Sequence, residues 1–229
     1  MCYHTANPGK KELKKAFEKK TIYYDQPEIF HVSGFVRPFL PVTLNSDVDS
    51  IISARWKLIP FWVKSEQDAN RSANTLNAVG EEIFEKKSYK DLIGKYRGLL
   101  YVTGFYEPHA SNGKTNDQNY FIYSAEREVF TLGIVYNIWK NEEGKEYPTF
   151  SILTTESNDL LSRIHNVGKR MPLIIPAEKR EHWLFAKGNE EIKELIVPYE
   201  GDLNSHRTVE VTKIRGKDTN VPEIQKEIG

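Results

Sequence analysis

Short segments rich in β-branched and aromatic residues recur along the chain, and glycine, proline, asparagine and aspartate separate them. This alternation of apolar runs and turn-forming residues is typical of β-strands joined by loops. The polar stretches 111–119 and 141–146 contain glycine and asparagine, which predicts hairpin connections between neighbouring strands. Strands are predicted at residues 29–36, 40–44, 51–62, 98–107, 119–125, 128–139, 149–156 and 206–214.

Fewer segments place apolar residues at the spacing of an α-helix. In residues 10–20, Leu13 and Phe17 lie four positions apart among lysines, which predicts a surface helix with one apolar stripe. The lysines are interpreted as a solvated face, with phosphate binding as the alternative. Further helices are predicted at residues 81–93, 156–164, 176–186 and 189–197.

The order of these elements predicts the fold class. Neither a repeat, a low-complexity tract nor a linker divides the 229 residues, which are enough to bury one full core. Strands outnumber helices, and the hairpin connections favour antiparallel pairing. We therefore expect a single α+β domain over residues 1–229, with a strongly curved, mostly antiparallel sheet and helices outside it.

Composition narrows the classes of function. Hydrophobic residues make up 39% of the chain, which indicates a globular protein, and 32 basic residues balance 32 acidic ones. This zero net charge excludes a large overall field that would attract nucleic acid, although a local basic patch can still contact phosphates. No apolar run approaches the roughly 18 residues of a membrane span, and no signal-like apolar core follows the N-terminus. A single cysteine cannot form an intramolecular disulfide, so a cytoplasmic location is expected.

That single cysteine stands at position 2, where a small residue usually permits removal of the initiator methionine. Removal of Met1 gives Cys2 a free α-amine, with a reference pKa of about 7.7–8.0, beside a thiol with one of about 8.5. Such an aminothiol condenses with an aldehyde to an imine, and the thiolate then closes a five-membered thiazolidine. An internal cysteine cannot do this, because its nitrogen is in a peptide bond. The alternative is a terminal thiol without a role.

Three polar residues are candidate partners of Cys2. Glu107 ends a predicted strand, where a buried carboxyl can have a raised pKa and act as a general acid or base. The alternative interpretation of Glu107 is a surface or salt-bridged residue. His165 follows a predicted helix, and its alternative role is that of a helix-end residue favoured by the macrodipole. The alternative role of Asn77 is to start a helix.

The sequence lacks the common motifs for binding a metal or a nucleotide. The histidines show no metal-ligand spacing such as HExxH, and one cysteine cannot form a CxxC site. No glycine-rich loop of the GxxxxGK[ST] or GxGxxG kind is present. We therefore expect neither a metal nor a nucleotide cofactor.

Five segments stand in the chain in this order: Met1-Cys2, WKLIPFW (56–62), LNAVGEEIFEKKSY (76–89), TGFYE (103–107) and IHNVGKRMPLIIP (164–176). Together they resemble the SOS-response-associated peptidase (SRAP) family. The C-terminal stretch VTKIRGKDTNVPEI (211–224) is similar to the family's final segment. The resemblance implies the SRAP fold, a β-barrel-like α+β core with peripheral helices and a positively charged groove.

The resemblance also implies a function. Similar proteins bind single-stranded DNA at an abasic site, whose ring-opened sugar presents an aldehyde. The mature N-terminal cysteine traps it as a thiazolidine DNA–protein crosslink, which protects the lesion in the DNA damage response, and lyase and autopeptidase activities accompany the family. We expect a monomer, cytoplasmic and nucleoid-associated when bound to DNA.

Two alternatives stay open. One is a cysteine peptidase or amidase with Cys2 as the N-terminal nucleophile and its own amine or His165 as the base, including self-removal of Met1. The other is a non-catalytic DNA-binding module in which Cys2 is incidental. A free amine is needed for trapping and not for plain DNA binding, so the amine discriminates between these hypotheses.

Site residues follow from the resemblance. Cys2 is the nucleophile, Asn77 positions the N-terminus and the sugar, Glu107 shuttles protons, and His165 assists ring opening and crosslink reversal. The implied DNA-binding residues are His4, Pro38, Trp56, Pro60, Trp62 and Arg170. For the aromatic residues among them, core packing is the alternative to base stacking.

The chain also departs from the family pattern. Position 79 is valine where the family typically has a phosphate-binding arginine, position 4 is histidine where many members have arginine, and position 108 is proline where an aromatic residue is common. Three extra residues separate His165 from Arg170. These changes predict modest, salt-sensitive DNA binding.

Overall fold

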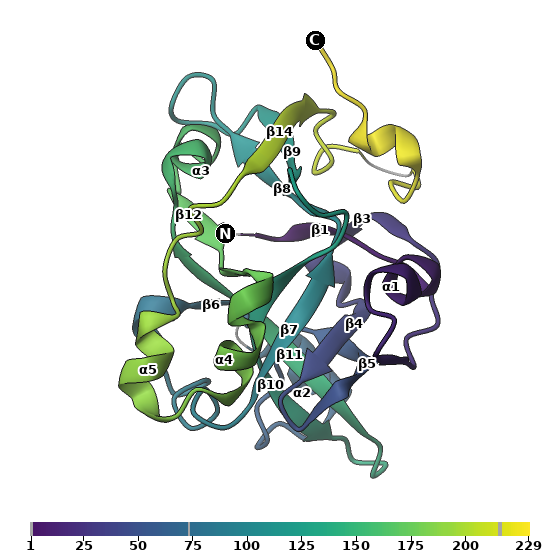
Figure 1. The fold of residues 1–229 in the computed structure, drawn as a ribbon, viewed down its shortest axis with the longest axis vertical. Helices are drawn as coiled ribbons and strands as arrows, with labels where there is room; N and C mark the ends of the chain where they lie inside the picture. Colours follow the sequence, from purple (N-terminus) through teal and green to yellow (C-terminus); the bar gives the residue numbers. More distant parts are fainter. Residues whose placement is uncertain (1, 73, 215–216) are drawn as a thin grey trace.

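Five strands close into a barrel in the spatial order β5, β4, β7, β10 and β11 (Figure 1). The computed structural model describes residues 2–72, 74–214 and 217–229. Four of the five barrel contacts are antiparallel, and the parallel pairing of β11 with β5 closes the ring. The barrel strands are β4 (Phe39–Leu44), β5 (Asp47–Trp56), β7 (Arg97–Val102), β10 (Phe130–Lys140) and β11 (Glu146–Glu156).

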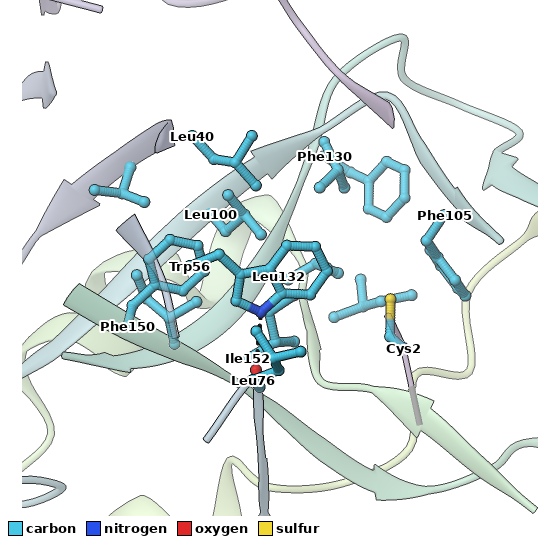
Figure 2. Packing of buried hydrophobic residues seen from close by; sticks show 14 of the residues in the cluster. Cys2, Leu40, Trp56, Leu76, Leu100, Phe105, Phe130, Leu132, Phe150 and Ile152 are labelled. Atoms are coloured by element: carbon cyan, nitrogen blue, oxygen red, sulfur yellow. Dashed lines mark hydrogen bonds between the residues drawn. The ribbon is translucent and has the colours of Figure 1, made fainter. Parts of the chain in front are cut away.

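Alternate residues of the barrel strands face its interior. Leu100 and Val102 of β7 join the internal cluster, whereas Leu99 packs outside the barrel. Trp56 is fully buried in the interior, where its indole N–H donates to the carbonyl of Leu76 at 2.9 Å (Figure 2). This hydrogen bond satisfies the polar atom that an indole brings into an apolar core.

Short strands extend the barrel sheet. The two-residue β2 pairs in parallel with β5, while β6 and β12 pair with β11 and β13 pairs with β10. Their bounds are β2 (Thr21–Ile22), β6 (Asn77–Val79), β12 (Arg170–Pro172) and β13 (Ile174–Ile175).

A second, five-stranded sheet has the order β14, β9, β8, β1 and β3. The N-terminal strand β1 is an interior strand of this sheet, because β8 pairs with one of its edges and β3 with the other. The order of strands therefore fixes the start of the chain from both sides. The bounds are β1 (His4–Asn7), β3 (Ile29–Ser33), β8 (Gly104–His109), β9 (Gln118–Ser124) and β14 (Leu203–Thr208).

Helices lie on the outside (Figure 1). Trp183 and Ile192, from α4 and α5, pack on the outer surface of the barrel with Leu153 of β11. Among the residues that the structure describes, no helix has the length and apolar character needed to cross a membrane. The helices are α1 (Lys10–Ala16), α2 (Glu66–Arg71), α3 (Asp159–Ile164), α4 (Arg180–Phe185) and α5 (Gly188–Glu194).

The α+β barrel-like fold is confirmed, but some predicted elements are wrong. Residues 81–93 form no α-helix: a 3-10 turn over Gly80–Glu82 precedes further turns, which bury Ile83 and Ile93 under the barrel. The strand predicted at 98–107 is two strands in different sheets, separated at residue 103.

The break beside residue 103 has a steric basis. A Cβ atom on Gly104 would lie 2.3 Å from the ring of Phe121 and 2.8 Å from the carbonyl oxygen of Ile122. Only a residue without a side chain therefore lets β8 approach β9 at this point.

Arg97 connects the barrel to α4 through hydrogen bonds to backbone carbonyls. Its guanidinium donates to Ile93, Trp183 and Ala186 at 2.7–2.8 Å, and to Leu184 at 3.3 Å. Burial lowers the pKa of this fully buried arginine. Its structural role is to satisfy the carbonyls at the end of α4, where the helix leaves them without partners.

We predict that Arg97→Met destabilises the protein by roughly 3 kcal/mol or more, because several buried carbonyls lose a charged donor. Urea denaturation followed by tryptophan fluorescence measures the change. Arg71→Met, which removes an exposed arginine, is the matched control and should change the free energy of unfolding little. Equal effects of the two substitutions would contradict this role of Arg97.

Candidate active site

Cys2 lies immediately before β1 and is fully buried at the edge of the barrel core. It belongs to the internal apolar cluster together with Phe105 and Phe130 (Figure 2). Its Sγ atom donates to the carbonyl of His4 at 3.7 Å. Burial, and then the charge of Glu107, raise the thiol pKa well above its ordinary value. The reference pKa of about 8.5 therefore does not hold for the thiol of Cys2 in the folded protein.

Glu107 reaches Cys2 through the pairing of β8 with β1. The register places His4 opposite Tyr106 and Thr5 opposite Phe105, so Glu107 is the next residue of β8 toward the N-terminus of β1. Its side chain has no exposed surface, and burial raises the pKa of its carboxyl to about 7. A carboxyl of this pKa can both give and take a proton near neutral pH.

His165 follows α3 and approaches the same carboxyl. Its Nδ1 atom lies 3.8 Å from Oε2 of Glu107 and 2.9 Å from the carbonyl oxygen of Arg170. The shorter contact places the ring proton on Nδ1, so Nε2 is the acceptor atom of the neutral ring. Burial lowers the pKa of His165, which favours that neutral form.

Gly168 packs directly against the His165 ring. A Cβ atom at position 168 would lie 2.5 Å from Nε2 and 2.6 Å from Cε1. Sequence reasoning did not identify this glycine, because its partner is a side chain in the preceding turn and its spacing matches no motif. Its absent side chain keeps the acceptor nitrogen of His165 accessible.

Two side chains fasten the end of α3 to β8. The His109 Nδ1–H donates to the carbonyl of Ile164 at 3.0 Å. The Asn166 amide donates to the carbonyl of Ala110 at 2.8 Å and accepts from its N–H at 3.1 Å. These contacts on either side of residue 165 hold its imidazole near Glu107. Neither residue was found from the sequence.

Asn77 comes from β6, which pairs in parallel with β11 and places Asn77 opposite Ile152. Both of its side-chain amide atoms are buried and lack a well-formed hydrogen bond within the described part of the chain. The amide is near enough to Tyr3 to oppose the increase that burial causes in the pKa of that phenol. Asn77 thus lies beside the residue that follows Cys2, in a strand instead of at a helix start.

A cleft of about 640 Å³ opens above these residues. Cys2 and Glu107 have no exposed surface, but their neighbours Tyr3 and His165 line the cleft. No group of three or more potential metal-ligating side chains occurs within residues 2–72, 74–214 and 217–229. The lining residues are Tyr3, His4, Phe35, Val79, Tyr106, Pro108, Asn116, Asn119, His165, Gly168, Arg170 and Thr212.

His4 brings hydrogen-bonding capacity to the cleft without a positive charge. Its Nδ1 atom lies 3.0 Å from Nε2 of His31, and the two rings stack with an interplanar angle of 13°. The His31 Nδ1 atom in turn lies 2.7 Å from the hydroxyl of Thr219. Burial lowers the pKa of each imidazole to about 4, so both rings are neutral at physiological pH.

Arg170 lines the cleft, but one face of its guanidinium is already engaged. Its Nη2 donates to Glu81 at 2.8 Å and to the carbonyl of Thr154 at 2.7 Å. The nearby carboxylate of Glu81 offsets the positive charge that a phosphate would meet. The three residues before it, absent from the family pattern, lie in the turn that carries Gly168.

The predicted stacking residues divide into two groups. Trp56 and Pro60 are buried, so core packing describes them and the expected base-stacking surface at these two positions is corrected. Trp62 is 46% exposed, with the Nζ of Lys87 5.5 Å from the ring centroid. Pro38 is partly exposed immediately before β4. Within the WKLIPFW segment, the exposed aromatic side chains are therefore those at its end, Phe61 and Trp62.

Comparison with known proteins identifies the family of this chain. The model of the SOS response associated peptidase (SRAP) family matches residues 1–214. The abasic site processing protein YoqW of Bacillus subtilis is 31% identical over 178 residues, 76% of each chain. The abasic site processing protein YoaM of the same organism is 27% identical over 205 residues, 85% of this chain and 87% of YoaM.

A solved structure shows the same similarity in three dimensions. A Bacteroides thetaiotaomicron protein superimposes with a TM-score of 0.85 and 31% identity, covering 99% of this chain and 100% of its own. Because the family model covers nearly the whole chain, this protein belongs to the SOS response associated peptidase family.

Proposed function

We propose that this protein processes abasic sites by forming a covalent thiazolidine crosslink between a mature N-terminal Cys2 and single-stranded DNA. The names of the relatives YoqW and YoaM support the abasic site as the target. The observation that carries the proposal is the placement of Cys2 beside a buried carboxyl of pKa about 7 and a neutral imidazole. The crosslink shields the lesion.

The proposed reaction joins both nucleophiles of Cys2 to the aldehyde carbon of the ring-opened abasic sugar. After removal of Met1, the free α-amine adds to the aldehyde, and loss of one water gives an imine. The thiol then adds its sulfur to the imine carbon and its proton to the nitrogen, closing a five-membered ring. One aldehyde and one aminothiol give one thiazolidine and one water, without an oxidant or a cofactor.

Glu107 is assigned the proton transfers in these reaction steps. As an acid it protonates the departing hydroxyl of the carbinolamine, and as a carboxylate it accepts the thiol proton that burial retains on sulfur. The Nε2 atom of His165 accepts the hydroxyl proton of the closed sugar during ring opening, and the same group serves crosslink reversal. The Asn77 amide orients the sugar and the amine.

The state of the thiol also bears on the peptidase alternative. A thiolate nucleophile needs a lowered thiol pKa or an adjacent base that removes the proton. Burial raises the pKa of Cys2, and the nearest identified base is the same carboxyl that the imine chemistry uses. This environment favours an aldehyde trap that uses the amine first and the sulfur second.

We expect intact-mass analysis to show an adduct when the purified protein meets a short single strand with one abasic site. Its mass should equal the protein without Met1 plus the DNA minus one water. An undamaged strand, a Cys2→Ala variant and a protein extended by one uncleaved residue before Cys2 should give no adduct. Absence of adduct from wild-type protein that has lost Met1 would refute the proposal and favour the peptidase alternative.

Glu107→Gln tests the raised pKa. The folded state holds the Glu107 proton more tightly than the unfolded chain, in which the carboxyl has its ordinary pKa of 4.5. The contribution of Glu107 to the stability of the fold therefore decreases as the pH rises from about 4.5 through 7. Relative to wild type, the variant should gain up to about 3 kcal/mol between these pH values. Urea unfolding of both proteins at pH 5 and pH 8 measures this difference. A stability difference independent of pH would exclude the assigned pKa.

The same Glu107→Gln substitution should slow crosslinking by about 10²-fold or more.

Gly168→Ala tests the access to His165. The added methyl group would lie 2.5 Å from Nε2, so the imidazole must leave its present position beside Glu107 or the turn must shift. We predict a loss of crosslinking rate on the order of 10²-fold. Gly94→Ala, whose Cβ meets no atom within 4 Å, is the matched control and should react at the wild-type rate. An unchanged rate for Gly168→Ala would show that the position of the imidazole is not critical.

A further inference from the structure

A second cavity, of about 200 Å³, adjoins the active cleft. Phe35 lines both cavities, and its ring stacks on Tyr3 with centroids 5.0 Å apart. The Phe35 side chain is 59% exposed, so it forms an aromatic divider between the two spaces. Arg37, Lys57, Asn70, Ser72 and Asn74 supply the polar lining of the second cavity.

The backbone is strained at two of these lining residues. Among the described residues, positive φ angles outside glycine occur at Arg37 (54°), Lys57 (114°) and Lys169 (47°). All three are basic; the first two line the second cavity, and the third precedes Arg170 in the active cleft. Positive φ is unfavourable for residues with a Cβ atom, and such strain concentrates at functional sites.

No salt bridge within 4.0 Å joins Arg37 or Lys57 to a carboxylate in the described part of the chain, although the charge of Arg37 acts on the carboxylate of Glu66. The Lys57 Nζ donates to the carbonyl of Ser72 at 3.3 Å, and Arg37 donates to the carbonyl of Asn70 at 3.5 Å. The neighbouring Arg55, by contrast, pairs with a glutamate at 2.7 Å. Burial lowers the pKa of Lys57, and the charges of Arg37 and Arg55 lower it further. This local excess of positive charge is suited to an anion.

We propose that the second cavity is a phosphate subsite, in which Arg37 and Lys57 bind a phosphodiester of the strand whose abasic nucleotide occupies the active cleft. This inference rests on the proposed function, because it takes that strand as the occupant. The guanidinium fork and the ammonium group contact the phosphate oxygens, and the amides of Asn70 and Asn74 are further donors. Phe35 stands between phosphate and lesion and offers its ring to a neighbouring base.

Continuity with the active cleft and the polar lining favour a DNA phosphate as the occupant. The two cavities share Phe35, so a strand that leaves the active cleft meets the second cavity next. The basic and amide side chains that line this space provide hydrogen-bond donors for a phosphate. A bound phosphate would also account for the strain at Lys57, since the left-handed turn brings its ammonium group next to Arg37.

Lys57→Gly separates this role from a structural one. Glycine adopts a φ of 114° without strain and removes the charge, so the variant should be at least as stable as wild type. It should nevertheless bind an undamaged single strand several-fold more weakly. If Lys57 only fastens the chain at Ser72, the variant will lose stability and retain its affinity for DNA, which would overturn the proposal.

Salt dependence tests whether both cations contact one phosphate. The double variant Arg37→Gln with Lys57→Gly should reduce the slope of log affinity against log salt by about 0.7, the value for one phosphate of a single strand. Lys19→Gly, which removes an exposed lysine in the turn after α1, is the matched control and should retain the wild-type slope. Arg37→Gln alone provides a second test if the glycine variant fails to fold.

The arms of the experiment distinguish this inference from the proposed function. Adduct formation by wild type, together with unchanged DNA affinity and salt slope in the variants, would overturn the phosphate subsite alone. Weakened binding in the variants without any wild-type adduct would support the subsite and refute the crosslinking chemistry. A competition experiment at equal ionic strength distinguishes DNA phosphate from free phosphate as the ligand. If inorganic phosphate displaces DNA from wild type and not from the double variant, the cavity is a site for free phosphate. Failure of wild type to bind a single strand would overturn both proposals.

Discussion

The site depends on the insertion of β1 between β3 and β8. Chain ends usually fray, because few contacts hold them. Here His4 pairs with Ser33 on one side and with Tyr106 on the other, so the backbone beside Cys2 is held by two ladders. Asn7 continues this anchoring at the far end of the strand, where its amide donates to the carbonyl of Tyr101 at 2.9 Å. An N-terminal nucleophile thereby has the rigidity of a residue in the middle of a sheet.

The same insertion removes the active groups from water and decides where protons reside. Burial favours the neutral form of every titratable group, so the thiol of Cys2 and the carboxyl of Glu107 hold their protons more tightly. It has the opposite effect on the imidazoles of His4 and His165, which lose theirs more readily. Proton donors and proton acceptors therefore coexist at neutral pH within one site. Transfer of a proton from the thiol to a Glu107 carboxylate moves a negative charge and creates no further one, whereas transfer to a neutral imidazole creates an ion pair that the apolar surroundings oppose.

The sequence predicts those features that depend on local pattern or on a motif. Most strands follow from their apolar runs, and Cys2 and Glu107 follow from chemical reasoning and from the SRAP resemblance. The features that sequence reasoning missed depend on distant contacts. The break within residues 98–107 arises because Gly104 meets a ring on β9, and β5 and β11 close the barrel across about a hundred residues of sequence. Asn166 fastens α3 to β8 through hydrogen bonds between distant segments, and no pattern of residues along the sequence predicts such bonds.

Barrel closure and the proposed phosphate subsite meet at adjacent residues. Trp56 is the last residue of β5 and pairs with Phe150 of β11, where the ring of strands closes. The next residue, Lys57, donates its backbone N–H to the carbonyl of Phe150 at 3.0 Å, and its positive φ turns the chain out of the barrel. One turn therefore places an indole in the core and an ammonium group in the cavity beside the cleft. Because the Phe150 carbonyl is bound through the backbone, the side chain at position 57 can change without losing that closing hydrogen bond. The barrel thus determines where the charge of Lys57 lies, at a backbone angle that only glycine would adopt without strain.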